Sequence, residues 1–245
     1  MTYQGLDPRT RLVRWGLFAI AVALILAVTL PAAIDALLRI AQVAPDRLPW
    51  VATRLIGFLS YYAIAGSVIY GLLLSTKILD AIAHRPVTFA LHQDLAAIGL
   101  GLAGVHAVLL GLDASVPFSL LEIVVPFAAP YRPVWVGVGQ VALYLVAIVY
   151  ASFHLRRRIG QRSWRLLHYV TFLAFVGTTA HGILSGTDTA TAWAWWSYVV
   201  ATVAVVFLTV YRVVIAVEAR RAGAAEPGAA TAGRPSPLDV RAPGR

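Results

Sequence analysis

The chain has 245 residues, contains no cysteine and is poor in charged side chains, which make up only 13% of it. Without cysteine it cannot form disulfides, bind a metal through thiolates or hold a cysteine-ligated iron–sulfur cluster. Any metal must therefore be bound through nitrogen or oxygen. The apolar content of 60% is far above that of soluble domains and is typical of a multi-pass membrane protein.

Six apolar stretches are long enough to cross a hydrocarbon core of about 30 Å, which takes about 20 helical residues. They are residues 15–34, 51–74, 90–111, 134–153, 166–185 and 193–215. We therefore predict an all-α, polytopic bundle of six transmembrane helices over residues 15–217, after a cytoplasmic segment at 1–14. Residues 218–245 are rich in Ala, Gly and Pro, which predicts a disordered cytoplasmic tail.

Lysine and arginine are distributed unevenly among the predicted loops. Sixteen fall at the termini and in the second and fourth loops, and four fall on the opposite side. The positive-inside rule then puts both termini in the cytoplasm and the protein in the cytoplasmic (inner) membrane. Because the arginines flank apolar runs, the net charge of +9 indicates topology and not nucleic-acid binding. A cleaved signal peptide is the alternative interpretation of residues 15–34.

Four of the six histidines fall within the third and fifth predicted helices: His92, His106, His168 and His181. An ionisable group in a membrane helix costs a few kcal/mol unless it has a partner, so these four are candidate functional residues. A single such histidine is equally well explained as a hydrogen-bonding contact between helices. His84 and His154 lie in or beside basic loops and are interpreted as solvated or interfacial.

The spacing of the four histidines suggests two sites. His92 and His106 are 14 residues apart, about 21 Å along a helix, and project from nearly one face. His168 and His181 are 13 apart and would not share a face of a straight helix, so either that helix is distorted near Gly177 or the two bound groups are turned relative to each other. Because both helices run in the same direction, the first histidines share one depth and the second histidines another. Two facing imidazoles can fill both axial positions of a haem iron, so the pattern predicts two bis-histidine haems stacked across the membrane.

Glycines stand near the predicted ligands: Gly99, Gly101, Gly104, Gly177 and Gly182. They would give a flat macrocycle room, or would only let the helices pack closely.

Cationic side chains near the histidines are candidates to bind the anionic haem propionates. Arg54 lies just inside the second helix, at the depth of His106, where it would bind a propionate or snorkel to the interface. Arg165, with Arg162, would serve the other haem or add to the positive-inside charge. Trp164 is interpreted as an interfacial belt residue and not as an electron relay.

Specific motifs accompany the histidine spacings: RSWRLLHYVTF at 162–172, HG at 181–182 and TRLIGFLSYYAIAGSVIYGLLLS in the second helix. Together they resemble the ferric-reductase-like transmembrane domain family. That family includes the membrane halves of ferric reductases and NADPH oxidases, and the haem b subunit of the bacterial periplasmic methionine-sulfoxide reductase system. The stretches VPFAAPYRPVWVGVGQVAL and GTDT look like those of stand-alone bacterial, actinobacterial members.

The resemblance implies an oxidoreductase component that moves electrons across the membrane through two haems b. By that match His92 and His168 hold an inner haem, and His106 and His181 an outer one. We expect no flavin or nicotinamide site in this chain. Electrons would then come from a separate donor, a flavoprotein or a quinol, and pass to an extracytoplasmic redox acceptor.

Two other functional classes stay open. One is a quinol-linked cytochrome b subunit that anchors a dehydrogenase; the other is a haem-free transporter or assembly protein whose histidines are structural. The long, apolar loop at 112–133 is predicted to form an interfacial helix over the outer haem, where Glu122 or Tyr131 would contact an acceptor or a partner.

Overall fold

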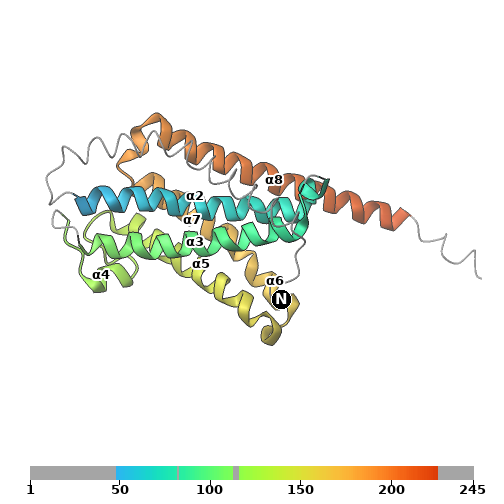
Figure 1. Ribbon diagram of the computed structural model, residues 1–245, viewed down its shortest axis with the longest axis horizontal. Helices are drawn as coiled ribbons and strands as arrows, with labels where there is room; N and C mark the ends of the chain where they lie inside the picture. The colour runs from blue at the N-terminus through green and yellow to red at the C-terminus, as the bar shows by residue number, and fades with distance from the viewer. Residues whose placement is uncertain (1–47, 82, 113–115, 226–245) are drawn as a thin grey trace, which may run out of the picture.

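The computed structural model describes residues 48–81, 83–112 and 116–225, and every regular element in them is helical (Figure 1). These elements are α2 (Leu48–Thr76), η2 (Ile78–Ala81), α3 (Arg85–Leu110), α4 (Leu120–Val124), α5 (Pro133–Ile159), α6 (Gln161–His168), α7 (Val170–Ser185), η3 (Asp188–Ala190) and α8 (Ala192–Ala225). Counting α6 and α7 as one segment, five helices are long and apolar enough to cross a membrane. The all-α prediction is confirmed, and these five candidate spans coincide with five of the six predicted ones. The predicted span at 15–34 lies outside the described residues.

Proline and glycine set several helix boundaries. Pro86 lies in the first turn of α3 and Pro133 opens α5, where the missing proline N–H costs no helical hydrogen bond. Gly160 ends α5 with a φ of 82°, a left-handed conformation that favours glycine. The last helix, α8, continues to Ala225, past residue 217 where we predicted the bundle to end, and extends beyond the other helices in Figure 1.

The bundle is built around α2, which packs along α3 and also against α8 and α7; Figure 1 shows α2 between α3 and α8. Ser60 Oγ of α2 donates to the Gly99 carbonyl of α3 over 2.8 Å, and a β-carbon at Gly99 would lie 2.7 Å from Ile64. Tyr61, Phe175 and Tyr198 form the buried centre between α2, α7 and α8. Outward-facing side chains such as Phe207, which is 64% exposed, are apolar, as a lipid-facing surface requires.

The fifth predicted helix is broken immediately after His168. At Tyr169 the backbone switches to three-residue hydrogen bonds, from Tyr169 N to Leu166 O and from Phe172 N to Tyr169 O. The His168 carbonyl instead accepts from Thr171 Oγ1 over 2.8 Å. The distortion needed to align His168 with His181 therefore lies at Tyr169, between α6 and α7, and not near Gly177.

Candidate functional site

The four helical histidines form two facing pairs. His92 of α3 faces His168 of α6, with ring centres 6.0 Å apart and ring planes at 77°. His106 of α3 faces His181 of α7, with ring centres 6.2 Å apart and planes at 81°. We call these the His92 pair and the His106 pair. This is the pairing expected from helices that run in the same direction.

Three of the four imidazoles are held through Nδ1 by a backbone carbonyl. His92 Nδ1 lies 2.8 Å from Ser67 O, His106 Nδ1 lies 2.8 Å from Thr53 O, and His181 Nδ1 lies 2.9 Å from Trp135 O. A carbonyl only accepts, so Nδ1 carries the proton in each ring and Nε2 keeps its lone pair. This is the arrangement that metal-ligating histidines show in proteins.

The fourth imidazole, His168, is held differently. Its ring stacks on the indole of Trp164, one helical turn earlier, with centres 5.1 Å apart and planes at 28°. Trp164 therefore contacts a predicted ligand directly, which its interpretation as a belt residue did not anticipate.

Three glycines give three of the imidazoles room on the neighbouring helices. A β-carbon at Gly57 would lie 2.9 Å from His106 Nδ1, and one at Gly71 would lie 3.1 Å from His92 Cε1. One at Gly139 would overlap the ring of His181. Sequence reasoning missed these residues, although Gly57 and Gly71 are 14 apart in α2, the same spacing as the two histidines of α3.

The glycines chosen from the sequence have other surroundings. Gly99 contacts Ile64, Gly177 contacts Ala142, and a side chain at Gly182 would meet Tyr198, so these three let helices pack closely. Gly101 and Gly104 face open space. The stretch 99–104 also has the GxGxxG spacing of dinucleotide-binding loops, but it lies inside the continuous helix α3 and not at a strand-to-helix turn.

A cavity of about 670 Å³ adjoins the His92 pair and is lined by both of its rings. Arg85, His154 and Trp164 also line this His92 cavity, and its lining contains no carboxylate among the described residues. The buried Nε1 of Trp164 has no hydrogen-bond partner in the described part of the chain. Arg165 is exposed on α6 and is not among the lining residues, so the arginine at this cavity is Arg85, which the sequence had not singled out.

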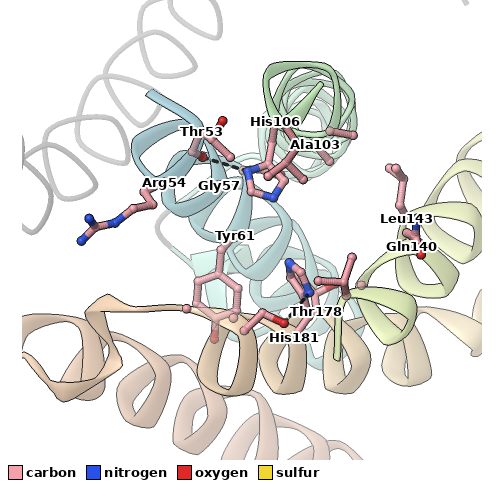
Figure 2. Close-up of a pocket in the computed structure, with 18 of the residues that line it drawn as sticks. Thr53, Arg54, Gly57, Tyr61, Ala103, His106, Gln140, Leu143, Thr178 and His181 are labelled. Carbon is pink, nitrogen blue, oxygen red and sulfur yellow. Dashed lines mark hydrogen bonds between the residues drawn. The ribbon is translucent and has the colours of Figure 1, made fainter. Parts of the chain in front are cut away.

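A narrower cavity, of about 180 Å³, adjoins the His106 pair. Figure 2 shows His106 and His181 pointing toward each other across this His106 cavity, with Tyr61 beside them. Arg54 lines it too, but its guanidinium points away from the two rings in Figure 2 and forms an ion pair with Asp188, to which Nε donates over 2.6 Å. The anion that we expected Arg54 to need is thus present in the chain.

In the described residues of the stretch 112–133, where we predicted an interfacial helix, the only helix is the five-residue α4, beside the His106 cavity. Ser119 caps it, and hydrogen bonds from the Ser119 N–H and hydroxyl lower the pKa of the Glu122 carboxyl. Tyr131 donates to Ser185 O over 3.2 Å. Both Glu122 and Tyr131 line the cavity.

Within the described residues, no group of three or more His, Asp or Glu side chains could hold a metal ion by itself. A metal site here would have to rest on the two histidine pairs.

Comparison with protein-family models, curated proteins and solved structures finds no match to this chain. A functional hypothesis therefore rests on the geometry of the two pairs.

Proposed function

We propose that the protein carries electrons across a membrane through two b-type haems, each bound by one histidine pair. The observation that carries the proposal is the facing arrangement of the imidazoles. A metal–nitrogen bond of about 2 Å on each side of an iron places the two ring centres about 6 Å apart. The observed separations are 6.0 and 6.2 Å.

Haem is favoured over a bare metal ion because each pair offers only two ligands. A porphyrin supplies four further nitrogens, so two imidazoles complete six coordination. A bare ion would need a third or fourth protein ligand, which the described residues do not place there. The fixed Nδ1 protons of His92, His106 and His181 leave Nε2 for the iron.

The surroundings of the His92 pair suit a macrocycle with carboxylate substituents. The His92 cavity falls within the usual 300–1,000 Å³ of ligand pockets. Its apolar walls match the ring, while Arg85 and the unpartnered N–H of Trp164 match an anionic propionate. At the His106 pair the support comes from the imidazole geometry, because that cavity is smaller.

The two pairs lie at different depths in the bundle. Their histidines on α3 are about 21 Å apart along the helix axis, about two-thirds of the hydrocarbon core. At the end of the bundle that holds the His92 pair, α5 closes with Arg156, Arg157 and Arg158. By the positive-inside rule this end faces the cytoplasm, the His92 pair holds the inner haem and the His106 pair the outer one.

Bound haem would supply a reversible one-electron couple at each pair. The two histidines of each pair would hold the iron from both sides and leave no position for substrate, so electrons would leave by outer-sphere transfer. The resemblance to the ferric-reductase-like transmembrane domain family suggests flow from an inner donor, a flavoprotein or a quinol, to an acceptor outside. The likeness rests on the WRLLHYVTF stretch and the histidine spacings.

The direct test is the reduced-minus-oxidised visible spectrum of the detergent-purified protein, with haem per chain determined as the pyridine haemochrome. We expect about two haems b in the wild type and about one in each of His106→Ala and His168→Ala. His84→Ala is the matched control, because His84 is exposed and belongs to neither pair. A colourless protein expressed with ample haem would overturn the proposal and leave the haem-free classes.

A further inference from the structure

His168 is oriented by contact with the indole of Trp164, whereas each of the other three histidines is oriented by a hydrogen bond to a backbone carbonyl. The indole lies one helical turn before the imidazole and stacks on it at 5.1 Å. Among the described residues, no group makes a hydrogen bond with a ring nitrogen of His168. The plane of this imidazole is thus set by an aromatic contact, while the rings of His92, His106 and His181 are set by Nδ1 hydrogen bonds.

The contacts around Trp164 hold it in this position. Its indole lies against Phe153 of α5, with ring centres 6.4 Å apart. The backbone next to His168 is fixed by Thr171, whose hydroxyl donates to the His168 carbonyl. Tyr169 lies under the guanidinium of Arg212 from α8, 5.6 Å from the ring centre. Three helices therefore fix α6 at the point where it presents both rings.

We propose that Trp164 is the positioning residue of the His92 site, and that iron bound there is consequently reduced more readily than iron at the His106 pair. This inference rests on the proposed haem function. A hydrogen bond from Nδ1 to a carbonyl makes an imidazole a stronger donor, which stabilises ferric iron and lowers its reduction potential. The His106 pair has two such ligands and the His92 pair has one.

The difference has a functional meaning. An electron that enters from the cytoplasmic side would rest on the His92 site and move outward only when an acceptor draws it from the His106 site. The protein would then hold an electron at the inner site, and would not pass it between two sites of equal reduction potential.

The experiment is a potentiometric titration of the purified haem-loaded protein, followed in the visible spectrum and by EPR of the ferric form. His106→Ala keeps only the His92 site, and its single component should coincide with the higher-potential component of the wild type. His168→Ala should keep the lower one. The reverse assignment, or two equal potentials, would overturn the ordering.

The role of Trp164 is tested by Trp164→Leu and Trp164→Phe. Leucine removes the stack and admits water beside His168 Nδ1, so the higher-potential component should shift to more negative values and its EPR signal should change. Phenylalanine keeps a stacking ring but lacks the indole N–H, so it should restore the EPR signal and most of the potential. Trp196→Leu is the control for the same loss of an indole, because Trp196 lies on α8 and is 61% exposed.

An unchanged higher-potential component in Trp164→Leu would overturn the positioning role, as would an equal shift of both components. If the leucine variant loses the haem altogether, restoration of haem and potential by Trp164→Phe still separates positioning from general damage. A wild type without haem would instead overturn the proposed function, so the two failures are distinguishable.

Discussion

Gly139 of α5 packs against the imidazole of His181 on α7, so closely that a β-carbon at Gly139 would overlap the ring. The same turn of α5 supplies the Trp135 carbonyl that holds His181 Nδ1 at 2.9 Å. Helix α5 therefore fixes both the position of the His181 imidazole on α7 and the ring nitrogen, Nδ1, that carries its proton.

Gly139→Ala should displace His181 and reduce haem at the His106 pair. The added methyl overlaps the ring, and overpacking of this kind costs about 1–3 kcal/mol. Haem per chain, measured as the pyridine haemochrome, should fall from about two toward one, while the component belonging to the His92 pair remains.

Gly101→Ala is the matched control, because Gly101 lies in a helix and a β-carbon there meets nothing within 4 Å. Alanine at such a position stabilises a helix by about 0.5–1 kcal/mol. Equal haem loss in both variants would show that the effect does not arise from contact with His181.

The ring planes give a spectroscopic prediction. If each pair binds haem, planes at 77° and 81° would leave the two iron orbitals that interact with the imidazoles nearly equal in energy. We expect ferric low-spin EPR signals with one very large g value at both sites. A well-resolved rhombic spectrum, typical of parallel imidazoles, would contradict the geometry of the pairs.

The two histidine pairs could be predicted from the sequence because the apolar runs and the histidines inside them are both local features. Apolar runs of about 20 residues indicate spans, and a histidine inside such a run stands out without knowledge of its neighbours. The spacings along two helices of the same direction then gave the partners, His92 with His168 and His106 with His181.

What the sequence did not reveal depends on contacts between helices. Gly57, Gly71 and Gly139 matter only because of which ring packs on each, and no motif marks that. No glycine or proline in the sequence marks the break at Tyr169. It is stabilised instead by Thr171 on the next turn and by Arg212 on α8, which the sequence does not place beside it.

Asp188 shows the same limit. It opens the short helix η3, 134 positions from Arg54 in sequence, and the two meet only because the start of α2 and η3 lie at the same end of the bundle. The boundary of α8 was missed because alanine continues a helix as well as it fills a linker.

Replacing Asp188 tests whether Arg54 serves the cofactor or the fold. The ion pair is partly buried, with side-chain exposures of 36% for Arg54 and 16% for Asp188. Asp188→Asn and Arg54→Gln should each destabilise the protein by about 1–3 kcal/mol, seen as a lower temperature of heat inactivation in detergent. The double variant should lose little more than either single one.

Haem content decides between the two roles. If Arg54 only holds Asp188, all three variants keep haem at the His106 pair when purified at low temperature. Loss of that haem in Arg54→Gln but not in Asp188→Asn would instead assign Arg54 to a propionate, the role expected from the sequence.

The last prediction compares Arg85 with Arg165 at the His92 site. Arg85 lines the His92 cavity, where its guanidinium is also 3.4 Å from Leu74 O and 3.7 Å from Asp80. Arg165 is exposed on α6 and does not line it. Both substitutions to glutamine remove one positive charge from the same end of the bundle, so they form a matched pair.

Because the Arg85 side chain is half exposed, water screens its charge, and Arg85→Gln should speed haem loss to apomyoglobin by about ten-fold at most. Arg165→Gln should leave that rate unchanged. Equal effects would mean that only the summed charge of this end matters, and a larger effect at Arg165 would restore the assignment expected from the sequence.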